Sequence, residues 1–69
     1  MEVLGKRLYE LRKEKGWSLR YIAHQVGINY KTYDDYEKNI SNPKPEMIVK
    51  LAELYGTTPN YLLGVDDVP

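Results

Sequence analysis

Gly27 constrains this chain more than any other residue, because it ends one helix just before the next can begin. Glycine lacks a Cβ and adopts at little cost the left-handed backbone conformation that closes a helix. Asn29 follows, and its side chain can accept hydrogen bonds from the free backbone N–H groups of a second helix. Between Gln25 and Tyr30 there is therefore room for a tight turn only. Helices joined so closely must cross steeply, and the small Ala23 suits the point where they approach.

This pattern is the sequence form of a helix-turn-helix over about residues 19–38. In that motif the second helix is commonly presented to the major groove of DNA. Tyr33 and Tyr36 continue the apolar stripe of the second helix, so we predict that both are buried. Tyr30 lies off the stripe, which favours a surface position suited to recognition.

The rest of the chain also has helical spacing, and it predicts a compact all-α domain of five short helices. Leu4, Leu8 and Leu11 form the apolar face of a first helix over about residues 2–15. Two further helices are predicted to begin at Pro45 and Pro59, since proline suits the first turn of a helix. The predicted caps and stops around these helices are Gly16, Ser18, Asn39, Gly56 and Thr58. We expect the domain over residues 1–64, with residues 65–69 as a tail or the start of a linker to a further domain.

Length and charge limit the functions that are open to the chain. Its 69 residues support one small core but no deep catalytic cavity. All ten Lys and Arg lie in residues 1–50 beside seven acidic residues, and residues 51–69 carry three acidic residues only. Because nucleic-acid binders are commonly strongly basic, the net charge of zero predicts modest nonspecific affinity for a polyanion.

Several classes of site are not expected from the residues present. There is no nucleophile–base–orienter set and no glycine-rich phosphate loop, so we expect neither an enzyme nor a cofactor. His24, the only histidine, has no second ligand grouped with it, which favours a surface residue over a metal site. No apolar run approaches the roughly 18 residues of a membrane span, and the lack of cysteine suits a reducing compartment. We therefore expect a cytoplasmic protein that contacts no membrane.

Six pieces of the sequence, in this order and spacing, resemble the lambda-type repressor domain (the Cro/CI, or XRE, family). They are LGKRLYELRKEKGWS at 4–18, IAHQVGI at 22–28, YEKN at 36–39, NP at 42–43, LAELYGTT at 51–58 and YLLG at 61–64. The resemblance implies a five-helix fold with the helix-turn-helix at its second and third helices. It also implies a DNA-binding transcription regulator, usually a repressor that binds a pseudo-palindromic operator in double-stranded DNA as a homodimer.

Carried over position by position, the resemblance implies roles for individual residues. Base reading falls on Tyr30, Lys31 and Thr32, with Asp35 one turn further on. Contact with phosphates falls on Ser18, Asn29, Lys38, Asn39, Ser41 and Lys44. Arg12 and Glu37 match positions that commonly form an ion pair between the first and third helices.

The last helix predicts a dimer interface from its own composition. Tyr61, Leu62, Leu63 and Val65 offer more apolar surface than one short terminal helix usually buries. We expect Leu62 in the core and some of Tyr61, Leu63 and Val65 at a two-fold interface. The alternative is that all of them pack internally.

Three features depart from the family pattern. Leu19 stands where a phosphate-binding glutamine is common, and Lys44 replaces the usual small helix cap. Asp34 and Asp35 place an acidic pair on the helix that should face DNA. An aspartate can accept a hydrogen bond from cytosine N4, but a pair that repels wrong sequences is an equal alternative. The acidic pair also leaves open a protein-interaction module in which this helix contacts a protein partner.

Overall fold

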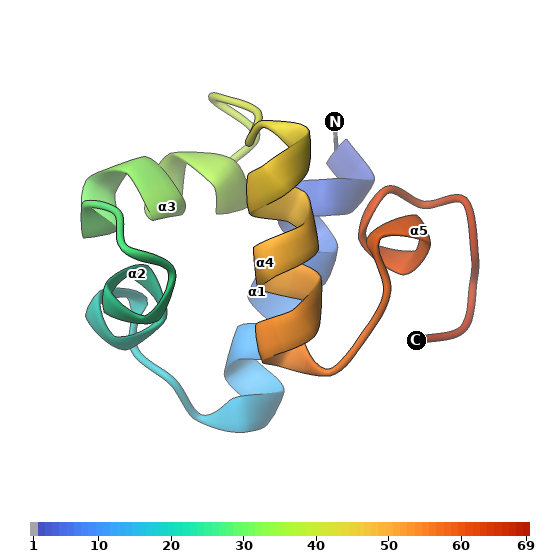
Figure 1. Ribbon diagram of the computed structural model, residues 1–69, viewed down its shortest axis with the longest axis horizontal. Helices are drawn as coiled ribbons and strands as arrows, with labels where there is room; N and C mark the ends of the chain where they lie inside the picture. Colours follow the sequence, from blue (N-terminus) through green and yellow to red (C-terminus); the bar gives the residue numbers. More distant parts are fainter. Residues whose placement is uncertain (1) are drawn as a thin grey trace.

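The computed structural model describes residues 2–69 and consists there of five α-helices. They are α1 (Glu2–Lys15), α2 (Leu19–Val26), α3 (Tyr30–Glu37), α4 (Pro45–Tyr55) and α5 (Pro59–Leu62). In Figure 1, α2 and α3 lie to the left of α4 and α5 lies to its right. No helix in residues 2–69 is long and apolar enough to cross a membrane. The predicted all-α fold, with the helix-turn-helix at α2 and α3, is confirmed.

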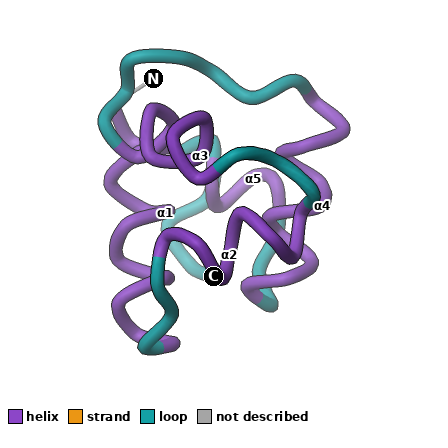
Figure 2. The backbone as a smooth tube through the Cα atoms, turned by 90° about the vertical axis from the view of Figure 1, so that its left-hand side faces the viewer, coloured by secondary structure: helices purple, strands orange, loops and turns teal. Residues whose placement is uncertain are grey.

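Local capping determines where α2 and α3 begin and end. The Ser18 hydroxyl oxygen accepts a hydrogen bond from the Tyr21 backbone nitrogen at 3.0 Å and starts α2. Asn29 Oδ1 accepts a hydrogen bond from the Lys31 backbone nitrogen at 2.8 Å and starts α3. Gly27, between the two helices, has φ 76°, the left-handed conformation that the sequence predicted. The tight turn therefore follows from residues adjacent to it in sequence, and Figure 2 shows the short loop that joins the two helices.

The helices α4 and α5 also begin at prolines that follow possible capping residues, but only one of the two caps forms a side-chain hydrogen bond. Pro45 and Pro59 occupy the first turns of α4 and α5 as predicted. Thr58 caps α5 by accepting from the Tyr61 nitrogen at 3.1 Å, whereas Lys44 makes no side-chain cap hydrogen bond to α4. The start of α4 is therefore the more weakly capped of the two.

A core shared by all five helices fixes their arrangement. Its members are Leu4, Leu8, Leu11, Ile22, Ala23, Val26, Tyr33, Tyr36, Ile48, Leu51, Ala52, Tyr55 and Leu62. The predicted burial of Tyr33, Tyr36 and Leu62 is confirmed. Trp17 packs against this core, and its ring lies 5.6 Å from the Tyr55 ring, centroid to centroid. The helix α3 packs on both α1 and α2, so the core sets its direction.

Arg7 of α1 binds both α5 and the segment that follows it. The Arg7 guanidinium donates to the carbonyl oxygen of Tyr61, and it donates to that of Asp66 at 2.7 Å. Its carbon also lies 4.1 Å from the centroid of the Tyr61 ring. The residues after α5, expected as a tail or the start of a linker from residue 65, thus lie within reach of Arg7 at Asp66 and Asp67.

Candidate nucleic-acid interface

The first turn of α3 is exposed, while the opposite face of the helix is buried. Tyr30, Lys31 and Thr32 all lie at the surface. Tyr33 is fully buried and Tyr36 is nearly so. The three residues that the resemblance marks for base reading are thus grouped on one accessible end of the helix.

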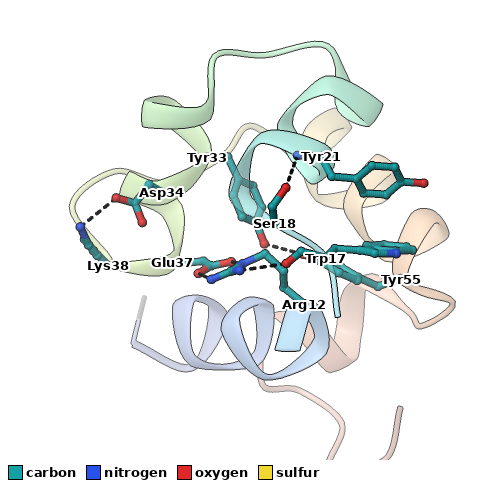
Figure 3. Close-up of polar contacts among 9 residues, drawn as sticks. All are labelled: Arg12, Trp17, Ser18, Tyr21, Tyr33, Asp34, Glu37, Lys38 and Tyr55. Atoms are coloured by element: carbon teal, nitrogen blue, oxygen red, sulfur yellow. Dashed lines mark hydrogen bonds and ion pairs between the residues drawn. The ribbon is translucent and has the colours of Figure 1, made fainter. Parts of the chain in front are cut away.

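An ion pair between Arg12 and Glu37 anchors the other end of α3. Arg12 Nε lies 2.7 Å from Glu37 Oε2, and Arg12 Nη2 lies 3.0 Å from Glu37 Oε1, a two-pronged contact (Figure 3). Arg12 Nη1 also donates to the Trp17 carbonyl oxygen at 3.0 Å. Glu37 raises the pKa of the Arg12 guanidinium, chiefly through these hydrogen bonds. The structure therefore contains the pair expected between the first and third helices, and it joins α3 to α1 and to the turn before α2.

A buried pair of tyrosines supports α3 from α4. The hydroxyl oxygens of Tyr33 and Tyr55 lie 2.6 Å apart (Figure 3). Burial is the main cause that raises the pKa of both phenols above the ordinary value. Both hydroxyls are therefore neutral near pH 7, and their hydrogen bond satisfies two polar groups that the core would otherwise leave unpaired.

The acidic pair on α3 is matched by lysines one turn away. Lys31 Nζ lies 3.1 Å from Asp35 Oδ1, and Lys38 Nζ lies 2.8 Å from Asp34 Oδ2. Figure 3 shows the second of these pairs. Each lysine that the sequence marks for DNA contact on or beside α3 therefore has a carboxylate neighbour.

The six residues expected at phosphates lie in different settings. The side-chain oxygens of Ser18 and Asn29 are already used as helix caps. Asn39 has φ 59°, and its side chain faces α1, where Oδ1 accepts from the Gly5 nitrogen at 3.2 Å. Lys38, Ser41 and Lys44 are exposed along the loop after α3. This loop is the part of the expected phosphate set that the structure leaves most accessible.

The expected interface residues at the C-terminal end differ in exposure. Tyr61 and Leu63 are partly buried against the core, and Arg7 covers one face of the Tyr61 ring. Val65 is 69% exposed and Val68 is 77% exposed. The apolar surface in this region thus lies mainly beyond the end of α5.

Sequence reasoning missed two residues that shape this site. Gly5 lies where α1 meets α3: a Cβ there would lie 2.5 Å from the Glu37 carbonyl oxygen. Arg20, on the first turn of α2, has its guanidinium carbon 4.1 Å from the centroid of the Tyr30 ring. Both depend on contacts between residues distant in the chain, and no local pattern marks them.

Comparison with known proteins agrees with this geometry. The profile of a family described as "Helix-turn-helix domain" matches residues 5–68. The HTH-type transcriptional regulator AnsR of Bacillus subtilis is 48% identical over 58 residues, 84% of this chain and 50% of that protein. ImmR, a regulator from the same organism, is 35% identical over 65 residues, 94% of this chain and 51% of that protein. The transcriptional repressor RstR of a cryptic phage in Vibrio cholerae is 33% identical over 54 residues, 78% of this chain and 49% of that protein.

The chain therefore spans about half the length of these curated relatives. The match of the family profile extends from within α1 past the end of α5, so it includes all of the helix-turn-helix. By this match and by its fold, the chain belongs to the lambda-repressor type of the helix-turn-helix domain family.

Proposed function

We propose that this chain is the DNA-binding part of a transcription regulator, with the N-terminal end of α3 in the major groove. The observation that carries the proposal is the exposed first turn of α3 on a helix whose other face is fixed by Tyr33 and Glu37. A helix held in this way can present a few side chains to base edges in a defined register. The names of the relatives, which are transcriptional regulators and a repressor, support repression as the activity. Its place of action would be the cytoplasm, where bacteria such as those of the relatives hold their DNA.

Specific contacts in this proposal come from few residues. Lys31 can donate to guanine O6 or N7, and Tyr30 and Thr32 offer hydroxyls and apolar surface for a thymine methyl group. Asp35 is adjacent to Lys31 and either accepts from cytosine or repels other sequences. The exposed Lys38 and Lys44, with Ser41 between them, are placed to contact phosphates. Ser18, Asn29 and Asn39 would contribute through the positions of the backbone groups that they order.

We also propose that two copies bind a pseudo-palindromic operator. The exposed Val65, with the partly buried Leu63 and Tyr61, supplies the apolar surface for a two-fold contact. A dimer on DNA would recognise half-sites about 34 Å apart, one helical turn of the duplex. Sedimentation at high protein concentration, with and without DNA, tests this contact, and a monomer under both conditions would exclude it.

The charge of α3 favours a second candidate function, the binding of a protein partner. Tyr30–Glu37 contains one lysine and three carboxylates, but the side chain of Glu37 is buried and neutralised by Arg12. The remaining Lys31, Asp34 and Asp35 leave an excess of one negative charge, which opposes approach to a polyanion. A basic surface on a protein would complement it. Salt dependence separates the two candidates, because affinity for DNA falls with salt according to the number of phosphates neutralised.

Selection of bound sites from a random duplex library tests the DNA proposal directly. We expect an enriched site with two related half-sites, and Lys31→Ala should weaken binding to it by about 1–3 kcal/mol and binding to random DNA much less. Lys13→Gln is the matched control, since Lys13 is an exposed lysine of α1 outside the expected contacts. Lack of binding to any duplex at low salt would reject DNA recognition and favour the protein partner. Unchanged affinity and preference in Lys31→Ala would show that α3 does not read the bases.

A further inference from the structure

The Arg20 guanidinium lies over the ring of Tyr30, a cation–π contact across the helix-turn-helix. Arg20 lies on the first turn of α2, and Tyr30 is the first residue of α3. The guanidinium carbon lies 4.1 Å from the centroid of the Tyr30 ring. Both residues are exposed, and 41% of Tyr30 is accessible to solvent. The pair therefore lies at the surface, beside the residues expected to read bases.

Arg20 differs from the other two arginines in its electrostatic neighbours. Arg7 lies 3.9 Å from an oxygen of Asp67, and Arg12 is paired with Glu37. Within residues 2–69, no carboxylate oxygen lies within ion-pair distance of the Arg20 guanidinium. Arg20 thus keeps its full charge available to an external anion or acceptor.

A guanidinium that rests with its face on an aromatic ring keeps its edge free. The five N–H donors of arginine lie in the plane of the group and point outward from it. An aromatic ring against that plane holds it in one orientation and covers none of the donors. The edge can then donate two parallel hydrogen bonds to a pair of acceptors, such as guanine O6 and N7 or two phosphate oxygens.

The charge distribution around α3 makes this edge important. Lys31 is already paired with Asp35, and Lys38 with Asp34. Arg20 therefore supplies a positive charge next to the first turn of α3 that no carboxylate of the described chain offsets. We propose that Arg20 contacts DNA through a pair of acceptors on the duplex, and that Tyr30 is the positioning residue that holds its guanidinium. This inference rests on the proposed function.

Four single variants and two double variants test the pair by their affinity for the selected duplex. Arg20→Gln should weaken binding about tenfold. Arg20→Lys keeps the charge but loses the planar donor edge, so it should restore little of that affinity. Tyr30→Phe keeps the ring, so Arg20→Gln should cost as much affinity in the Tyr30→Phe background as in the unchanged chain, whereas Tyr30→Leu should lose the affinity that depends on Arg20. Tyr30→Leu should cost much less when Arg20 is already Gln, because the two residues act together.

Two readouts distinguish the possible acceptors. If Arg20 contacts guanine, Arg20→Gln should relax the base preference at one position. Replacing that guanine with 7-deazaguanine should also weaken DNA binding by the unchanged chain. If Arg20 contacts phosphates, the loss should be similar on selected and random duplexes, and the slope of log affinity against log salt should fall by about 1. Either result supports a DNA contact by Arg20. Thermal unfolding of each variant checks that the fold is retained.

The failure of this inference is distinct from that of the proposed function. If Lys31→Ala weakens specific binding but Arg20→Gln matches the Lys13→Gln control, α3 reads DNA and Arg20 does not contribute. If Tyr30→Phe and Tyr30→Leu bind the duplex equally well, and Arg20→Gln weakens both as much as it weakens the unchanged chain, Tyr30 is not the positioning residue. If the unchanged chain binds no duplex, both proposals are rejected.

Discussion

Arg12 and Glu37 form a nearly buried ion pair that joins α1 to the last turn of α3. Their side chains are 11% and 4% exposed, and two hydrogen bonds of 2.7 and 3.0 Å connect them. The pair of Lys38 and Asp34 has a similar closest distance, 2.8 Å, but its lysine is 60% exposed. Burial, rather than distance, therefore separates a structural pair from a surface pair in this domain.

Removal of the Glu37 charge should destabilise the fold strongly. Glu37→Gln leaves the Arg12 guanidinium buried without its counter-charge, and we expect a loss of about 3 kcal/mol in the free energy of unfolding. Urea denaturation followed by circular dichroism measures the loss. Asp34→Asn is the control, because its partner Lys38 is 60% exposed and remains solvated without the carboxylate, so the pair contributes little to stability. Equal stability of the two variants would show that the buried pair does not fix α3.

The Tyr33–Tyr55 pair should make the domain unstable in alkali. Burial raises the pKa of both phenols in the folded state, whereas a tyrosine in an unfolded chain has a pKa of about 10. Above that pH the unfolded chain loses protons that the folded chain keeps. Stability from this source is therefore complete below about pH 10 and falls above it, by up to about 2.7 kcal/mol per pH unit for two groups. Urea denaturation between pH 8 and pH 11 would measure this fall.

Tyr55→Phe tests the assignment of this pH dependence. The variant keeps the ring that stacks with Trp17 but removes one of the two shielded hydroxyls. Its stability near neutral pH should be lower, because the Tyr33 hydroxyl loses its partner. The decline of its stability above about pH 10 should be roughly half as steep. An unchanged slope would assign the alkaline decline to other groups.

Gly5→Ala should destabilise the domain even though alanine is the better helix former. The substitution gains up to about 1 kcal/mol in helix propensity, but its Cβ would lie 2.5 Å from the Glu37 carbonyl oxygen and from Asn39 Oδ1. A backbone oxygen cannot move without shifting the end of α3, and overpacking of this kind costs about 1–3 kcal/mol. We expect a lower melting temperature and weaker DNA binding together. A variant at least as stable as the parent would contradict the close approach of α1 and α3.

The sequence predicts features of this domain that are determined locally. Gly27, Ser18 and Asn29 act on backbone groups within a few residues, so their roles follow from their positions. The contact of Arg20 with the Tyr30 ring and the hydrogen bonds from Arg7 to the C-terminal segment depend on how the helices pack. Periodicity describes which face of a helix is apolar, but it does not tell which charged side chain lies opposite another. The Arg12–Glu37 pair was predicted because a family resemblance supplied that long-range information.

Asp35→Asn decides between the two interpretations of the acidic residue on α3. Asp35 Oδ1 lies 3.1 Å from Lys31 Nζ, and its side chain is 25% exposed. Because the carboxylate is paired with Lys31, it is not free to accept a hydrogen bond from a base. We therefore expect Asp35 to reduce the positive charge that Lys31 presents and so to weaken the binding of any DNA. The substitution should then tighten binding to every duplex and steepen the salt dependence by up to about one phosphate contact. Site selection with the variant is the measurement, and Asp34→Asn, which frees Lys38 in the same way, is its control. A changed base preference at a single position, with no general gain in affinity, would instead identify Asp35 as a reader of cytosine.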